Sequence, residues 1–161
     1  MDVLFENRYT FDRPLMVEYI GFLLAPQRKI GGAIAALALL MTVLNWGKGM
    51  GYFFGACTLI LLGALLLQGP MVLNRLEMVN AALHGGESVE TVYQLTEEGI
   101  HLTEGETTVN IKYAQITSLH ETAHLYLLVM GGQNAVMLKK GGFTVGEASE
   151  LMAFVKRKTN L

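Results

Sequence analysis

Residues 120–124 read HETAH, and their types and spacing are those of a zinc-dependent hydrolase. On an α-helix, an H-E-x-x-H segment places both histidines on one face, where they bind one zinc ion while the glutamate acts as general base. His120, Glu121 and His124 would take these roles in this chain. A zinc metalloprotease is therefore one hypothesis for its function.

The residues around HETAH indicate strands rather than a helix. AQITSL precedes the motif and LYLLVM follows it, and both segments have the composition of β-strands. A two-residue turn at 122–123 would pair Glu121 with His124 across the ladder. It would also pair His120 with Leu125, so that the two histidines lie on opposite faces and share no metal ion. We therefore predict that HETAH is the tip of a β-hairpin.

Other signals for chemistry are weaker. Glu147 and Glu150 lie downstream of HETAH at a distance that some metalloproteases use for a third ligand, but nothing marks either one clearly. The chain has only Asp2 and Asp12 as aspartates, too few for a magnesium or phosphoryl-transfer site. Its net charge of −2 predicts no broad nucleic-acid surface. We assign no catalytic, cofactor-binding or metal-binding residue from the sequence.

The middle of the chain has the composition of a membrane hairpin. Overall, 52% of the residues are hydrophobic and 16% are charged, but Lys48 is the only charged residue between positions 30 and 74. The apolar runs on either side of it would reach roughly 27 and 39 Å as helices, against a hydrocarbon core of about 30 Å. A buried hairpin in a soluble domain would need a larger surrounding core than the remaining residues supply. We predict a two-span transmembrane hairpin at residues 30–73.

The link GKGMG between the runs leaves room only for a tight turn, so both ends of the hairpin lie on one side of the membrane. Gly51 and Gly55 form a small-xxx-small pair that we expect to pack within the hairpin. Basic residues flank the spans at Arg13, Arg28, Lys29 and Arg75, against Lys48 alone in the turn. The positive-inside bias then predicts a multi-pass protein of the cell membrane with both termini cytoplasmic.

The segments that flank the spans have their own patterns. Residues 1–29 predict one strand followed by a short amphipathic helix, which Asp12 caps and Pro26 ends. Residues 74–86 continue the second span as an amphipathic helical stalk, with a stop at Gly85–Gly86. Neither span contains Asp, Glu, His or Arg, which argues against an ion path or a transporter.

Residues 87–161 predict a separate antiparallel domain. Short strand-like segments lie at 90–96, 100–102, 106–113, 114–121, 124–130 and 134–140, separated by turn signals. A closing helix would start with a capping box of Thr144 and Glu147, with Phe143 outside it as a staple. The fold class is therefore membrane α+β: a two-helix transmembrane hairpin plus a small antiparallel β-barrel or sheet, closed by a C-terminal helix in the pleckstrin-homology-like plan.

Residues 111–158 resemble the C-terminal domain of the YcxB-like family of bacterial membrane proteins. The family pattern appears as Ile116, Glu121 and Thr122, Tyr126 and Leu127, Ala135 with Lys139, Phe143 and the helix from Val145. Leu138 departs from it, because the family often has proline there. The preceding strand and two spans also match the family's order. The resemblance implies a membrane-anchored, pleckstrin-homology-like cytoplasmic domain, and no known reaction.

Two basic clusters could contact anionic lipid headgroups or a partner: Lys139, Lys140, Lys156, Arg157 and Lys158. Basic residues near a lipid surface contribute about 1 kcal/mol each. They serve equally as solubilising charge and as cations matched to the dipole of the closing helix. We predict a non-enzymatic integral membrane protein whose cytoplasmic domain docks an unidentified protein through its exposed strands or a strand–helix groove. The alternative is a membrane-bound zinc metalloprotease that uses HETAH.

Overall fold

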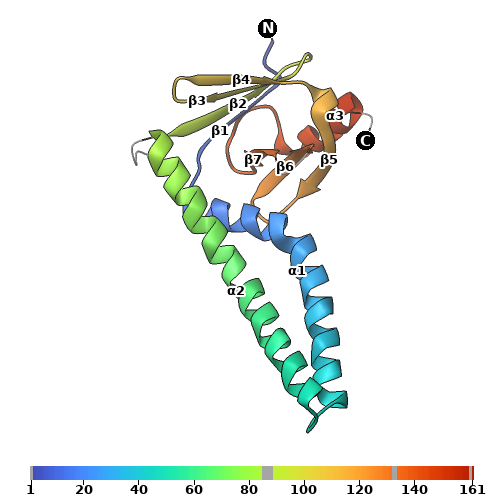
Figure 1. Ribbon diagram of the computed structural model, residues 1–161. Helices are drawn as coiled ribbons and strands as arrows, with labels where there is room; N and C mark the ends of the chain where they lie inside the picture. Colours follow the sequence, from blue (N-terminus) through green and yellow to red (C-terminus); the bar gives the residue numbers. More distant parts are fainter. Residues whose placement is uncertain (1, 85–88, 132–133, 160) are drawn as a thin grey trace. The chain divides into compact units, whose positions relative to one another are not determined.

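The computed structural model describes residues 2–84, 89–131, 134–159 and 161 (Figure 1). The chain divides into two compact units. One unit comprises Met1–Leu15 and Gly86–Leu161, so it joins the two ends of the chain, and the other comprises Met16–Gly85. The predicted helix stop at residues 85–86 lies outside the described residues.

The first helix, α1, spans Arg13–Leu44 and runs through Pro26 without a break. Its start is as predicted, because the Asp12 carboxylate accepts a hydrogen bond from the Leu15 amide at 3.1 Å. The predicted end at Pro26 is wrong. Proline removes one backbone hydrogen bond and bends a helix, yet helices of membrane proteins often continue past it. The ribbon of α1 turns sharply between its darker blue start and its lighter remainder (Figure 1), and we attribute this bend to Pro26.

The second helix, α2, spans Gly49–His84 and is also continuous. It packs on α1 where glycine permits close approach. A Cβ atom on Gly31 would lie 2.6 Å from Leu65 Cδ2, and one on Gly55 would lie 3.5 Å from Thr42 Cγ2. A Cβ atom on Gly51 would lie 2.3 Å from the carbonyl oxygen of Asn45. The small-residue pair therefore packs within the hairpin, as predicted.

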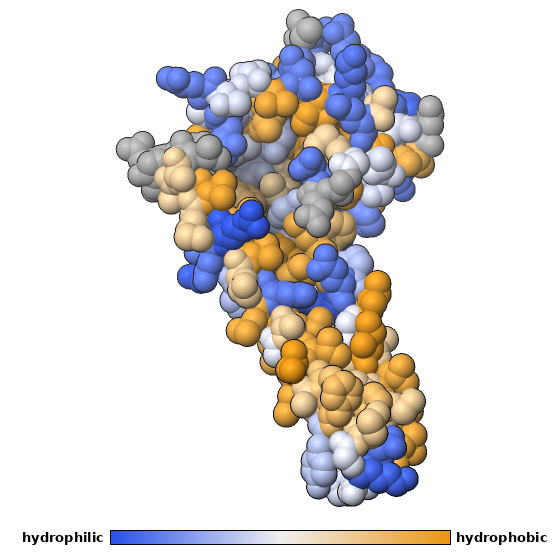
Figure 2. Space-filling model, in the orientation of Figure 1, coloured by the Kyte–Doolittle hydropathy of each residue, from blue (hydrophilic) through white to orange (hydrophobic). Residues whose placement is uncertain are grey.

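The outer surface of this helical unit is apolar. Both helices are long and apolar enough to cross a membrane, with peak mean hydropathy of 1.3 and 2.1, and only 11% of each apolar window is buried. Hydrophobic residues gather over the hairpin (Figure 2). Trp46, Tyr52 and Phe53 are 78%, 74% and 60% exposed at the turn. Core helices of a soluble domain would be mostly buried, so a bilayer is the environment that this surface matches.

The other unit consists of two antiparallel sheets and a C-terminal helix. The first sheet has the strand order β4-β3-β2-β1-β8 and the second has β5-β6-β7. The strands are β1 (Phe5–Thr10), β2 (Glu90–Leu95), β3 (Ile100–Glu104), β4 (Thr107–Ile111), β5 (Ile116–Glu121), β6 (Leu125–Met130), β7 (Ala135–Lys139) and β8 (Phe143–Val145). The helix α3 spans Ala148–Thr159. The antiparallel domain with its C-terminal helix is confirmed.

The predicted barrel does not close within the described residues. Closure would need one continuous hydrogen-bonded ladder around all strands. A 3-10 turn at Tyr113–Gln115 (η1) interrupts the chain between β4 and β5, and the two sheets remain separate. Side chains of β1 bridge them instead. The Asn7 amide bonds both main-chain groups of Lys139, and the Tyr9 hydroxyl donates to the Met137 carbonyl at 2.6 Å.

The predicted capping box of the closing helix is wrong. Thr144 lies in β8, and its hydroxyl donates to the Glu6 carboxylate at 2.7 Å instead of capping a helix. Gly146 follows with φ +77°, a conformation that cannot continue a right-handed helix. The helix α3 therefore begins at Ala148, and its buried residues are Leu151, Phe154 and Val155.

Candidate binding surface

HETAH lies on a β-hairpin, as predicted, and not on a helix. His120 and Glu121 end β5, and β6 begins at Leu125. The predicted register is wrong by two residues, because Glu121 pairs with Tyr126 and His120 pairs with Leu127. The helix that a zinc hydrolase of this motif requires is not formed at these residues, so the structure gives no support to that alternative.

The side chain of Thr122 explains the wider hairpin loop. Its hydroxyl donates to the Leu125 carbonyl at 3.1 Å and accepts from the Leu125 amide at 3.2 Å, while the Thr122 amide also donates to that carbonyl. These bonds close a loop longer than the two-residue turn expected from composition. Across the described ranges, no group of three or more His, Cys, Asp and Glu residues is arranged to hold a metal ion.

The helix α3 is held by an aromatic cluster. The Phe154 ring lies 5.2 Å from the Phe5 ring of β1 and 5.9 Å from the Tyr113 ring of η1, measured between centroids. All three residues are buried. Offset and edge-on contacts of this kind contribute roughly 0.5–1.5 kcal/mol per pair beyond the burial of area. The N-terminal strand thus fixes the position of the C-terminal helix.

A surface groove runs beside this cluster, between β1 and α3. It has a volume of about 390 Å³ and is lined by Phe5, Ser149, Glu150, Ala153, Phe154 and Arg157. The ring of Phe154 forms part of its apolar wall, and the Arg157 guanidinium lies 5.7 Å from the centre of that ring. Glu150 and Arg157 add one charge of each sign to the lining. Three of the six lining residues are polar or charged, and Phe5 and Phe154 are only 5% and 6% exposed, so the apolar part of the groove is small.

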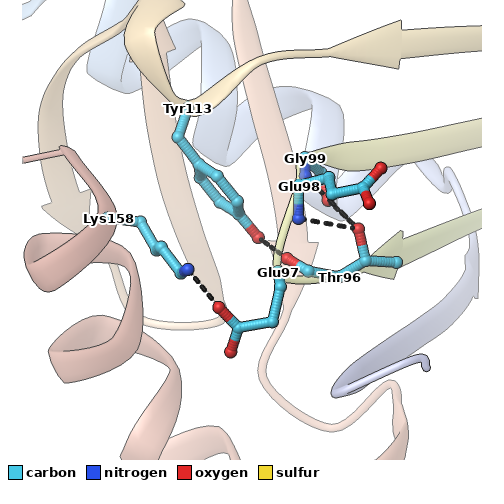
Figure 3. A network of polar contacts seen from close by, with 6 residues as sticks. All are labelled: Thr96, Glu97, Glu98, Gly99, Tyr113 and Lys158. Atoms are coloured by element: carbon cyan, nitrogen blue, oxygen red, sulfur yellow. Dashed lines mark hydrogen bonds and ion pairs between the residues drawn. The ribbon is translucent and has the colours of Figure 1, made fainter. Parts of the chain in front are cut away.

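A polar network ties the end of α3 to the turn between β2 and β3 (Figure 3). The Lys158 ammonium forms an ion pair with Glu97 in this turn. The Thr96 hydroxyl accepts hydrogen bonds from the amides of Glu98 and Gly99, both at 3.3 Å. The Tyr113 hydroxyl donates to the Thr96 carbonyl at 2.8 Å. Burial raises the pKa of the Tyr113 phenol, so it stays protonated and keeps this donor.

The structure divides the five candidate basic residues between two elements. Lys139 and Lys140 lie at the end of β7, and Lys156, Arg157 and Lys158 form the last turn of α3. Two of the five are already paired, Lys140 with Glu121 at 2.7 Å and Lys158 with Glu97. Lys156 and Arg157 are exposed and form no ion pair with any described residue. Fewer charges are therefore available to a lipid surface than the sequence suggested.

Glu6 on β1 is an acid whose pKa is strongly lowered. Its carboxylate accepts hydrogen bonds from Arg8, Gln94 and Thr144, each at 2.7 Å. These donors, Arg8 first, lower the pKa of Glu6 to about 2. The carboxylate therefore joins β1 to both of its neighbours in the sheet, and its role is structural.

Residues 95–155 match the model of the YcxB-like protein family. This segment is YcxB-like. The match confirms the resemblance, and it runs from the end of β2 through most of α3. It covers less than half of the 161 residues and includes neither long helix nor β1. The two long helices and β1 are therefore described from the structure alone. Searches of curated proteins and of solved structures found no match.

Sequence reasoning missed most of the groove beside the YcxB-like helix. It assigned Arg157 to a basic cluster but gave no role to Phe5, Ser149 or Phe154. The signal for Phe154 was present, because it lies three residues after Leu151 and so shares the apolar side of a helix. The contact of Phe154 with Phe5 joins residues 149 positions apart, and no local pattern reveals it.

Proposed function

We propose that this chain is a non-enzymatic integral membrane protein that presents a small cytoplasmic binding module. The helices α1 and α2 form its two-span anchor in the cell membrane. The sheet unit, with its YcxB-like segment, docks a protein partner at the groove between β1 and α3. Two antiparallel sheets with a C-terminal helix also support a pleckstrin-homology-like assignment for this unit.

The observation that carries the proposal is the exposed apolar surface of the hairpin. Two helices long enough to cross a bilayer have 11% of their apolar windows buried, while the other unit buries its own core. A folded domain that supplies its own core and is attached to two such helices has the form of an anchored module. The basic flanks Arg13, Arg28, Lys29 and Arg75, against Lys48 in the turn, support cytoplasmic termini.

Binding rather than catalysis is supported by the groove. It is lined by Ala153 and by the small exposed parts of Phe5 and Phe154, while Glu150 and Arg157 offer opposite charges to the flanking residues of a peptide. We therefore propose that the partner segment carries one apolar anchor with polar neighbours. Contact with anionic headgroups is the weaker proposal, because Lys140 and Lys158 are neutralised by carboxylates.

Membrane topology is tested by cysteine labelling of full-length protein in intact cells. Cys57 is first replaced by serine, and single cysteines are placed at Lys48 or Leu161. We expect a membrane-impermeant maleimide to label the Lys48→Cys variant from outside and to label the Leu161→Cys variant only after lysis. Labelling of Leu161→Cys in intact cells would overturn the orientation. Extraction of the protein by carbonate would overturn membrane insertion itself.

The groove is tested by photo-crosslinking in native membranes. A photo-reactive phenylalanine analogue replaces Ala153, which lines the groove, or Thr117, which is exposed on β5 and serves as the control. We expect a crosslinked protein from position 153 and not from position 117. Ala153→Trp, which fills the groove, should remove binding of the partner identified in this way. Equal crosslinking at both positions would refute the groove as the docking site.

A further inference from the structure

The strand β4 is an open edge of the five-stranded sheet. It pairs with β3 in an unbroken register from Thr107↔Glu104 to Ile111↔Ile100, and no described residue pairs with its other side. Figure 1 shows β4 at the margin of this sheet. Residues 107–110 are exposed, with Val109 43% exposed. Its outward main-chain groups are therefore available to a further strand.

The other sheet edges are protected, which sets β4 apart. On β7, the Asn7 side chain takes both main-chain groups of Lys139. The ladder of β5 has a register shift between Ile116 and Ser118, and β8 has only three residues. Bulges, short strands and covering side chains are the usual protection of an edge, as are charged residues and proline within it. The five residues TTVNI of β4 have none of these features.

The sequence of β4 is complementary to itself. In an antiparallel pair of two β4 strands centred on Val109, Thr108 lies opposite Asn110 of the other copy, and Thr107 opposite Ile111. Glu106 lies in the turn before β4 and Lys112 directly follows β4, so in this arrangement the Glu106 end of each strand lies beside the Lys112 end of the other, and the two-fold axis brings these ends together twice. Glu106 and Lys112 are exposed, and neither forms an ion pair with any described residue.

We propose that β4 pairs with β4 of a second copy of this chain, antiparallel and centred on Val109, joining two five-stranded sheets into one. A second copy fits this edge, because its own Glu106 and Lys112 supply the opposite charge at each end of the strand in the two-fold arrangement. This pairing leaves the groove between β1 and α3 free, and it does not depend on the proposed partner there.

The first test is crosslinking of the full-length chain in liposomes with Cys57 replaced by serine. Val109→Cys places two thiols directly opposite each other across the new strand pair, while Thr117→Cys on β5 is the control. Under mild oxidation we expect a covalent dimer from Val109→Cys, and at least tenfold less dimer from the control. Equal yields from the two variants, or no dimer from Val109→Cys, would overturn the proposal.

The second test is a charge exchange read by energy transfer between differently labelled copies. Glu106→Lys places lysine opposite lysine in a homodimer, and Lys112→Glu places glutamate opposite glutamate. Each single variant should dissociate about tenfold more readily than wild type, since two opposite-charge pairs become like-charge pairs. A mixture of the two variants should recover association, because each copy then meets its complement. The proposal would be refuted if the charge exchanges did not change association, or if the wild type were monomeric.

Discussion

Replacing Asn7 by alanine should loosen the connection between the two sheets. Asn7 is fully buried, and its amide donates to the Lys139 carbonyl at 2.8 Å while accepting from the Lys139 amide at 3.0 Å. The Asn7 side chain therefore hydrogen-bonds the edge of β7 as a neighbouring strand would. Alanine would leave the Lys139 amide without a partner, while the Lys139 carbonyl would keep the hydrogen bond that it accepts from the Gly142 amide.

The expected loss follows from this one amide. A buried polar group that loses its partner costs about 1–3 kcal/mol, so Asn7→Ala should lower the free energy of unfolding by about 1–3 kcal/mol. A domain of this kind has roughly 5–15 kcal/mol in total, so the variant should fold but be weakened. Asn134→Ala is the control, because Asn134 is exposed before β7 and should change stability by less than about 0.5 kcal/mol.

Hydrogen exchange of the full-length protein in detergent measures the effect where it arises. The amide of Lys139 should exchange roughly 5- to 140-fold faster in Asn7→Ala, since each 1.4 kcal/mol of lost protection is a factor of ten. Amides of the β3–β4 hairpin, far from this bridge in the strand order, should change less. The reasoning is refuted if β7 exchanges at the wild-type rate while the variant remains folded.

Three further predictions test other parts of the structure. Because the pKa of Glu6 is lowered from 4.5 to about 2, its contribution is present above pH 4.5 and is lost as the pH falls toward 2. The stability advantage of wild type over Glu6→Gln should therefore shrink over that window in denaturation curves. A fragment of residues 86–161 lacks β1 and should fail to fold in circular dichroism until a peptide of residues 1–12 is added. Glu121→Gln removes one exposed ion pair and should change stability by less than about 1 kcal/mol. We expect the purified wild type to carry no stoichiometric zinc, and co-purified zinc that requires His120 would contradict the hairpin interpretation.

The positions of most strands and of the two long helices were predictable from the sequence pattern within each segment. Six segments rich in β-branched and aromatic residues, with turn signals between them, correspond to β2 through β7 within a few residues. The two long apolar runs correspond to two helices that are long enough to cross a membrane, and they too were recognised from composition within the segment. Each of these signals lies within the segment that folds, so reading it needs no knowledge of distant partners.

Two of the failures came from competition by distant or side-chain groups. Thr144 was expected to cap α3, but its hydroxyl bonds Glu6, a residue 138 positions away in the chain. Thr122 was expected in a two-residue turn, but its side chain bonds both main-chain groups of Leu125 and widens the loop. The same polar residue types favour both helix caps and turns, so composition does not distinguish the two. Which partner each side chain bonds depends on the groups that lie near it in the folded chain.

The strand pairing also constrains the membrane topology, independently of charge. The helical hairpin is inserted between two paired strands, because Thr10 at the end of β1 lies opposite Glu90 at the start of β2. The chain thus leaves the sheet and returns to it at one place, and the number of membrane crossings between these residues must be even. Under our proposal that α1 and α2 each cross the membrane, the number of crossings is two, which meets this condition. The basic residues then bear only on the proposed orientation.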